Sequence, residues 1–178
     1  MKKHLLFFST VIAMVACNNQ KATPAEDAAT IAKPAVALAY KASYSSSFEI
    51  GKPEYAAIIL KEEWKAWEEN KMDNMKSWMA DTIVAVFSDN TTIKGADSLA
   101  AIMKKYRAMF PSVIDTINAV IPVYSTDKKE DWVLVWATEI VTKTNGSKDT
   151  MAWMETWRFN KDGKADLLLQ FDRAKRKQ

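Results

Sequence analysis

The stretch Trp132–Phe171, WVLVWATEIVTKTNGSKDTMAWMETWRFNKDGKADLLLQF, decides the fold. It holds three segments rich in β-branched and aromatic residues, a composition typical of strands. Asn145-Gly146 and Asp162-Gly163 separate the segments, and such dipeptides accept the positive φ angles that two-residue hairpin loops require. We therefore predict consecutive antiparallel strands over residues 132–144, 148–160 and 165–171.

The chain before this stretch is predicted to be mainly helical. Pro53 suits the first turn of a helix that runs to about Asn70. Its buried stripe is expected to consist of Ala57, Leu60, Trp64 and Trp67. Further helices are expected after Asp73 and after Gly95, the last one stopped by Pro111, and strands over 82–87 and 113–124. Helices followed by an antiparallel meander predict an α+β domain, a curved antiparallel sheet packed on N-terminal helices.

The two turns also predict which side chains share a face of the sheet. If Asn145-Gly146 forms a two-residue loop, Trp136 lies opposite Glu155 and Thr138 lies opposite Trp153. If Asp162-Gly163 forms the next loop, Glu155 lies opposite Gln170. Because side chains alternate along a strand, these residues project from one face. The predicted pocket face consists of Trp136, Thr138, Trp153, Glu155, Trp157, Gln170 and Asp172, and the other face, with Val133 and Val135, is nearly all aliphatic but also carries Glu139.

This aromatic face with a polar centre suits an apolar or ring-shaped ligand. Glu155, desolvated among tryptophans, is expected to have a raised pKa and is the candidate catalytic acid or base. Two alternatives stay open. The tryptophans can instead form an oligomer interface or a plain core, with Glu155 paired to a cation or accepting a hydrogen bond from an indole.

Composition excludes several classes of protein. The chain has 178 residues, a formal net charge of +3 and 26% charged residues, which does not fit a nucleic-acid-binding protein. One Cys excludes a disulfide framework and a cysteine zinc site. With four Gly in the whole chain and no Gly-rich phosphate loop, we expect no cofactor, no metal and no nucleic-acid partner.

The N-terminus resembles a bacterial lipoprotein signal. Lys2 and Lys3 precede the apolar run 5–16, which is too short for a stable membrane span and ends at the chain's single cysteine, Cys17. We predict a signal peptide over 1–16, lipidation of Cys17 with fatty acyl chains such as palmitate, a flexible tether over 17–43 and a folded domain over 44–178. Asn18 follows the cysteine, where an aspartate would favour inner-membrane retention, so the expected location is the outer membrane of the cell envelope.

Processing at this site changes the chemistry that is possible. Removing Lys2 and Lys3 from 25 basic residues leaves 23 against 22 acidic ones, and His4, the only histidine, is lost as well. A domain without histidine cannot use a Ser-His-Asp triad, a Cys-His pair or a histidine-ligated metal.

The domain resembles the nuclear-transport-factor-2-like superfamily and, within it, the SnoaL-like and ketosteroid isomerase-like proteins. The resemblance covers roughly Phe48 to Arg173 and is carried by Ala80-Asp81-Thr82, Gly95-Ala96-Asp97 and Trp157-Arg158-Phe159-Asn160-Lys161-Asp162-Gly163-Lys164. It implies a cone-shaped sheet wrapped on helices with a pocket at its open end. Members include isomerases, dehydratases, cyclases, epoxide hydrolases and non-catalytic binding domains. The missing histidine departs from the Asp–His pairing of the cyclase and dehydratase branches.

The sequence thus supports one main hypothesis and two alternatives. The main one is a non-catalytic, lipid-anchored domain that binds a small apolar ligand or associates with a second copy of itself as a homodimer. The first alternative is a small-molecule isomerase or lyase that uses carboxylate acid–base chemistry in the pocket. The second is a purely structural envelope protein.

Overall fold

The computed structural model describes residues 39–174, which belong to one compact unit that begins at Ala39. The predicted signal peptide, Cys17 and most of the predicted tether lie outside the described residues. Within residues 39–174, no helix combines the length and the apolar character that crossing a membrane would require.

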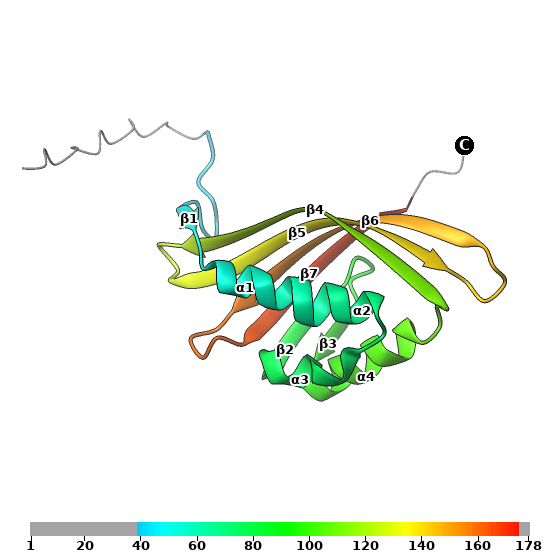
Figure 1. Cartoon of the computed structure of the whole chain (residues 1–178). Coiled ribbons are helices and arrows are strands. Elements are labelled where there is room, and N and C mark those ends of the chain that lie inside the picture. Colours follow the sequence, from blue (N-terminus) through cyan, green and yellow to red (C-terminus); the bar gives the residue numbers. More distant parts are fainter. Residues whose placement is uncertain (1–38, 175–178) are drawn as a thin grey trace, which may run out of the picture. The chain divides into compact units, whose positions relative to one another are not determined.

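A seven-stranded sheet forms one layer of the domain, and helices cover one of its faces (Figure 1). The strands are β1 (Phe48–Ile50), β2 (Met79–Val86), β3 (Thr92–Lys94), β4 (Ser112–Ser125), β5 (Glu130–Thr142), β6 (Lys148–Phe159) and β7 (Ala165–Ala174), in the spatial order β1-β4-β5-β6-β7-β2-β3. The helices are α1 (Pro53–Ile58), the π-helical segment η1 (Ile59–Lys65), α2 (Ala66–Glu68), the 3₁₀ turn η2 (Met72–Asn74), α3 (Met75–Trp78) and α4 (Ala96–Arg107).

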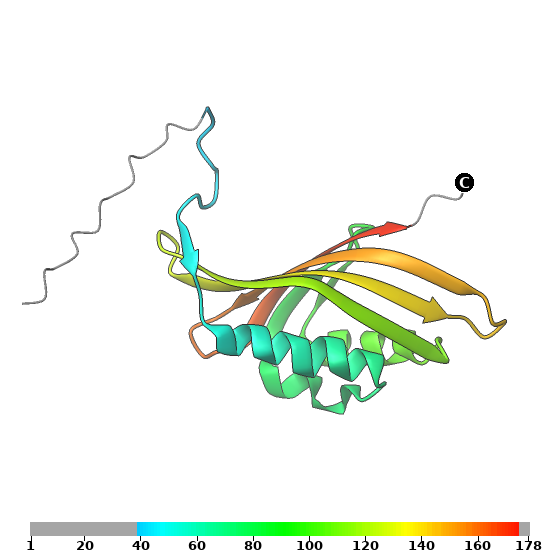
Figure 2. The same cartoon turned by 45° about the horizontal axis from the view of Figure 1, so that its top comes forward.

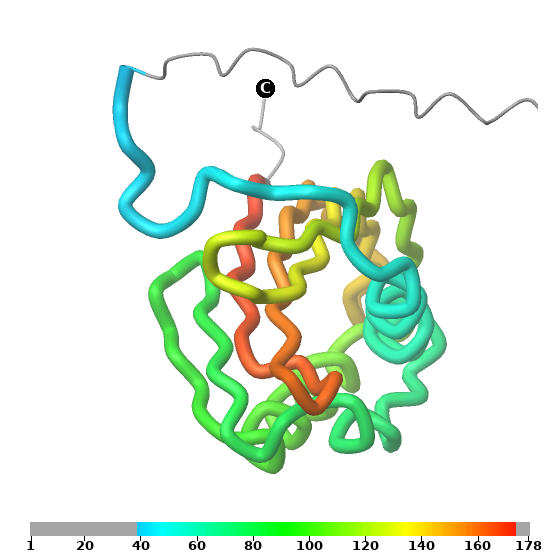
Figure 3. Tube along the Cα trace, turned by 90° about the vertical axis from the view of Figure 1, so that its left-hand side faces the viewer, coloured from blue at the N-terminus to red at the C-terminus, as the bar shows by residue number. Residues whose placement is uncertain are grey.

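The predicted α+β class, with a curved sheet packed on helices, is confirmed. The curvature of the sheet over the helices is clear in Figures 2 and 3. One part of the prediction is wrong, because the sheet is mixed: β2 runs parallel to β7 while the other pairings are antiparallel. Local sequence patterns do not encode such a pairing, because its two strands are far apart in the chain.

The first helical stretch, formed by α1, η1 and α2, begins and ends near the predicted residues. Pro53 occupies its first turn, where its missing N–H costs nothing. At the other end Asn70 adopts a left-handed conformation with φ 55°. The N–H of Lys71 donates to the carbonyl of Ala66 (2.8 Å) and that of Asn70 to Trp67 (3.0 Å), which is a Schellman motif.

The π-helical segment changes which residues of this stretch face the sheet. Ala57, predicted to be buried, is exposed, and Leu60 is only half-buried. The side chains that the wider turn directs inward are instead Ala56, Ile59, Glu63, Trp64 and Trp67. The predicted stripe is therefore correct from Trp64 onward and wrong before it, because a period of 3.6 residues does not hold through η1.

The hairpin between β5 and β6 differs from the prediction by one residue. Thr142 pairs with Lys148, and the loop closes with the Lys143 N–H donating to the Ser147 carbonyl (2.8 Å), so three residues lie between these two. Gly146 takes the left-handed position of this loop, with φ 81°. A one-residue shift moves every side chain of one strand to the opposite face relative to its partner.

Trp136 and Thr138 are therefore placed wrongly in the predicted pocket face. Glu155 lies opposite Val135, and Trp153 lies opposite Ala137. Trp136 and Thr138 project from the face that the helices leave uncovered, whereas Glu155 shares the helix-covered face with the valines of β5.

The second hairpin has the predicted register. Glu155 pairs with Gln170, Trp153 with Asp172 and Trp157 with Leu168. The loop itself is one residue longer than predicted, because the Asn160 N–H donates to the Lys164 carbonyl (2.8 Å) and three residues lie between these two. An irregularity between Arg158 and Phe159 restores the predicted register in the rest of the two strands. Gly163 has φ 71°, as the Asp-Gly signal requires.

The hydrophobic core lies between the helices and the covered face of the sheet. Its fully buried members include Ile59, Met75, Ile83, Leu99 and Trp157. Arg107 ties the helices together at one end of this core. Its guanidinium donates to the carbonyls of Trp67 (2.5 Å), Glu68 (2.9 Å) and Phe110 (2.7 Å), so it satisfies carbonyls at the ends of both α2 and α4.

Candidate functional site

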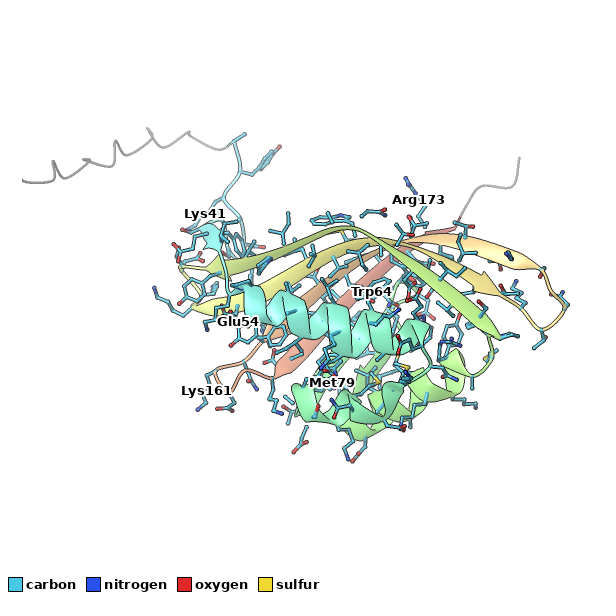
Figure 4. All side chains as sticks on the ribbon, viewed as in Figure 1. Lys41, Glu54, Trp64, Met79, Lys161 and Arg173 are labelled. Atoms are coloured by element: carbon cyan, nitrogen blue, oxygen red, sulfur yellow. The ribbon has the colours of Figure 1, made fainter. Side chains whose placement is uncertain are left out.

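A cavity of about 390 Å³ lies between the covered face of the sheet, the first helical stretch and α4. The apolar part of its wall consists of aromatic side chains, Trp64, Trp67, Phe87, Tyr106 and Trp153, together with Ile93, Ile102, Met103 and Met151. Figure 4 places Trp64 between the helix and the overlying sheet. The wall therefore offers flat apolar surfaces from both layers of the fold.

Glu63 brings a carboxyl group to this wall from the π-helical segment. The residue is only 4% exposed, and its Oε2 has no hydrogen-bond partner among residues 39–174. Burial raises the pKa of Glu63 well above its usual value, and the negative charges of Glu155, Asp115 and Glu139 add to the rise. The sequence prediction did not include this residue.

Glu155 contributes a second carboxyl group from the middle of β6. The indole N–H of Trp157 donates to its Oε2 (2.9 Å), and the Gln170 amide donates to its Oε1 (2.7 Å). Burial raises the pKa of Glu155, and these two hydrogen bonds offset part of the rise. The expected indole bond to Glu155 is therefore present.

Glu139 is the third buried carboxyl group of the wall. Its oxygens accept hydrogen bonds from the indoles of Trp67 (2.6 Å) and Trp153 (3.3 Å). Burial raises its pKa, against the lowering effect of these two bonds. Glu139 thus fixes the orientation of two aromatic walls, one from each layer of the domain.

Asp115 stands next to Glu139 on the neighbouring strand β4. Both of its carboxyl oxygens are buried, and neither has a hydrogen-bond partner in the part of the chain that the structure describes. Burial, together with the charges of Glu139 and Glu68, raises the pKa of Asp115 to about 8, although Arg107 acts in the opposite direction. This part of the domain therefore concentrates carboxyl groups that hold protons at unusually high pH.

The structure gathers some of the predicted site residues and separates others. Trp153, Glu155, Gln170 and Asp172 line the cavity. Trp157 is buried next to Glu155 and reaches it through its N–H, while Trp136 and Thr138 lie on the other face of the sheet.

Most lining residues were not predicted to line a pocket, among them Glu63, Tyr106 and Glu139. A signal existed for Glu63, because Ile59, Glu63 and Trp67 follow each other at intervals of four. A position in the middle of such an apolar stripe faces the core and not the solvent, and a glutamate is unusual there.

Comparison with known proteins shows which solved structures share this fold. No family model matches the sequence, and no curated protein matches it either. Solved structures do match. A LEH-like epoxide hydrolase from Mycobacterium tuberculosis has 13% identity and a TM-score of 0.53, covering 67% of this chain and 84% of its own. The ketosteroid isomerase from Mycobacterium sp. has 16% identity and a TM-score of 0.53, covering 68% and 98%.

The domain has the nuclear-transport-factor-2-like fold. A third protein of this fold, from M. tuberculosis, was solved in complex with estradiol-17β-hemisuccinate and has 16% identity and a TM-score of 0.53, covering 66% of this chain and 92% of its own. Identities this low establish the fold alone. Function in nuclear-transport-factor-2-like domains has to be argued from the site of each protein.

The carboxyl groups of the site are spread around the wall. Within residues 39–174, no three His, Cys, Asp or Glu residues come together in a way that could hold a metal ion. The chemistry that the arrangement offers is hydrogen bonding, charge and proton transfer by buried carboxyl groups inside an aromatic cavity.

Proposed function

We propose that this domain binds a small, ring-containing apolar ligand in the aromatic cavity and does so without catalysis. The cavity carries the proposal, because about 390 Å³ falls within the roughly 300–1,000 Å³ typical of small-molecule sites. Aromatic walls with a few convergent polar groups are the usual composition of such sites. The steroid complex of a protein with the same fold gives the proposal a precedent.

Native mass spectrometry of protein purified from its own membranes tests this proposal. We expect a bound small molecule that is lost from a Trp153→Ala variant, because Trp153 forms part of the wall. A Trp136→Ala variant is the matched control, since Trp136 lies on the opposite face of the sheet. Equal loss from both variants, or no bound molecule in the unaltered protein, would contradict the proposal.

We further propose that the domain is held in the cell envelope by a lipid on Cys17, at the outer membrane rather than the inner one. The basic n-region, the short apolar run and the single cysteine at its end support this. Metabolic labelling with radioactive palmitate and membrane fractionation test it. Cys17→Ser is expected to abolish labelling and to release the protein from the membrane fraction.

A second candidate function is proton transfer in an isomerase or lyase. The observation that favours it is Glu63, a buried carboxyl group with an unpartnered oxygen in the cavity wall. Its raised pKa and that of Glu155 would let one carboxyl group donate a proton while the other accepts one. Turnover of a bound ligand that Glu155→Gln abolishes would support this candidate over simple binding.

Self-association is a further part of the proposal. The uncovered face of the sheet carries exposed apolar side chains, among them Ile114, Ile121 and Phe171. An exposed apolar face of this kind is typical of an interaction surface. We propose that a second copy of the chain covers it. Sedimentation velocity is expected to show a dimer that Phe171→Glu dissociates and that Met109→Lys, at an exposed site after α4, leaves intact.

A further inference from the structure

The titratable side chains that line the cavity, within residues 39–174, are all acidic. Acidic side chains reach it from five parts of the described chain, and they are Glu63, Asp89, Glu139, Glu155 and Asp172. No lysine or arginine within residues 39–174 lines it. The nearest buried cation, Arg107, directs its donors at three backbone carbonyls and not at the cavity.

Glu63 adds an unused acceptor to this negative wall. Its side chain is more than nine-tenths buried, and Oε2 lacks any donor. A buried acceptor without a partner is costly, so such groups in folded proteins call for an explanation. A ligand that brings an N–H donor into the cavity would supply the missing partner.

The aromatic walls suit the same kind of ligand. Trp64, Trp67, Tyr106 and Trp153 present ring faces or edges around the cavity, and Glu139 holds two of them in place through their indole N–H groups. The faces of such rings attract organic cations, and the attraction grows when water is excluded.

We propose that the cavity is selective for an organic cation, a protonated amine with an apolar or aromatic body, whose ammonium group donates to the Glu63 carboxyl group between the tryptophan walls. This inference rests on the proposed binding function and names the chemical class of its ligand. The scattered positions of the acids favour an organic cation over a metal ion, which would need three or more of them together.

Binding has a consequence for protons. Carboxyl groups from several elements face the cavity or adjoin it, with Tyr106 and Arg107 from α4 beside them; they are Glu63, Asp89, Asp115, Glu139, Glu155 and Asp172. A buried neutral carboxyl group must ionise to form an ion pair with the ammonium group. Binding of the amine is therefore accompanied by release of a proton to the solvent.

Three probes of the same shape and different charge test the proposal. They are phenethylammonium, the neutral 2-phenylethanol and the anionic hydrocinnamate, titrated against the purified lipid-free domain while the fluorescence of the wall tryptophans is recorded. Because a hydrogen bond to a charged group contributes about 1.5–3 kcal/mol, the ammonium probe is expected to bind about tenfold or more tightly than the alcohol. Hydrocinnamate is expected to bind most weakly.

The matched pair of variants is Glu63→Gln and Glu54→Gln. Glu63→Gln keeps the shape of the side chain and removes its charge, so it is expected to lower the affinity for phenethylammonium about tenfold and to leave that for 2-phenylethanol unchanged. Glu54 is exposed on the same helical stretch, and its variant is expected to change neither affinity. Circular dichroism verifies that both variants are folded.

Each outcome separates this inference from the function on which it rests. If the alcohol binds as tightly as the amine, or if Glu63→Gln affects both probes alike, the charge selectivity is wrong and the binding function stands. If none of the probes binds and no small molecule is retained by the purified protein, both are wrong. Calorimetry in buffers of different ionisation enthalpy is expected to show proton release on binding of the amine and none on binding of the alcohol.

Discussion

Asp115 and Glu139 lie directly opposite each other on the neighbouring strands β4 and β5, beneath the helices. Like charges in directly opposed positions destabilise a sheet when both are ionised. Here neither oxygen of Asp115 has a partner, whereas both oxygens of Glu139 accept indole hydrogen bonds. The proton of this pair therefore resides mainly on Asp115, in line with the pKa of about 8.

The raised pKa of Asp115 makes the domain less stable in alkaline solution. The folded state holds the proton up to about pH 8, and the unfolded state loses it near the ordinary value of 3.8. The folded state binds more protons between these values, so the free energy of unfolding falls as pH rises through this range and falls no further above the folded pKa.

Asp115→Asn removes this loss of stability. Its free energy of unfolding, relative to that of the unaltered protein, is expected to be higher near pH 9 than near pH 5 by on the order of 1–3 kcal/mol. Urea denaturation at both pH values measures it. Asp149→Asn removes an exposed carboxylate and is expected to show no such difference.

Replacing Glu63 is expected to stabilise the domain. Glu63→Gln removes the cost of a buried carboxyl group with a raised pKa and leaves the packing unchanged. The free energy of unfolding is expected to rise by about 1 kcal/mol near pH 8, and by less near pH 5, where the carboxyl group is protonated in the folded state. Urea denaturation next to Glu54→Gln provides the comparison. A loss of stability would mean that Glu63 has a structural partner.

Arg107 is expected to be the most sensitive polar position of the domain. Arg107→Met leaves three backbone carbonyls without this donor and removes a buried cation near Asp115 and Glu139. Removing one member of a buried charge network costs about 3–5 kcal/mol, so the midpoint of denaturation should fall strongly. Lys105→Met, at an exposed position of the same helix, is expected to change the midpoint little.

The loop between β5 and β6 depends on the left-handed conformation of Gly146. Nothing lies within 4 Å of the position that a Cβ would take, so the cost of Gly146→Ala comes from the backbone alone. With φ at 81°, this cost is expected to be about 1 kcal/mol in the free energy of unfolding. Thermal denaturation measures the change. A variant as stable as the unaltered protein would show that the loop can adopt another conformation.

Much of the sheet was predictable, because its signals are local. Both glycine turns are one residue longer than the predicted two-residue loops. Between β6 and β7 the irregularity at Arg158 and Phe159 offsets the extra residue, so the predicted register holds. Between β5 and β6 nothing offsets it, and the prediction places Trp136 and Thr138 on the wrong face. Loop length depends on how the strand ends pair, and a dipeptide does not determine that pairing.

The site was less predictable, because its residues come from elements that meet only in the folded domain. Glu155 was found through its strand, and Glu63 was missed because the π-helical segment alters the period by which a helix is read. The parallel contact of β2 with β7 places Phe87 at the cavity wall, and no local pattern in either strand predicts it.

The π-helical segment also has a consequence for the history of this chain. Such π-helical turns are rare and are frequent at functional sites. A homologue that lacks one residue between positions 59 and 65 would have a regular α-helix there. Because the wide turn takes up about one extra residue, the residues before and after it would keep their faces, and one of the two adjacent buried positions, Glu63 and Trp64, would be lost. A gap of one residue in an alignment of related chains would therefore separate proteins that carry the Glu63 carboxyl group in their cavity from proteins that have lost it or never acquired it.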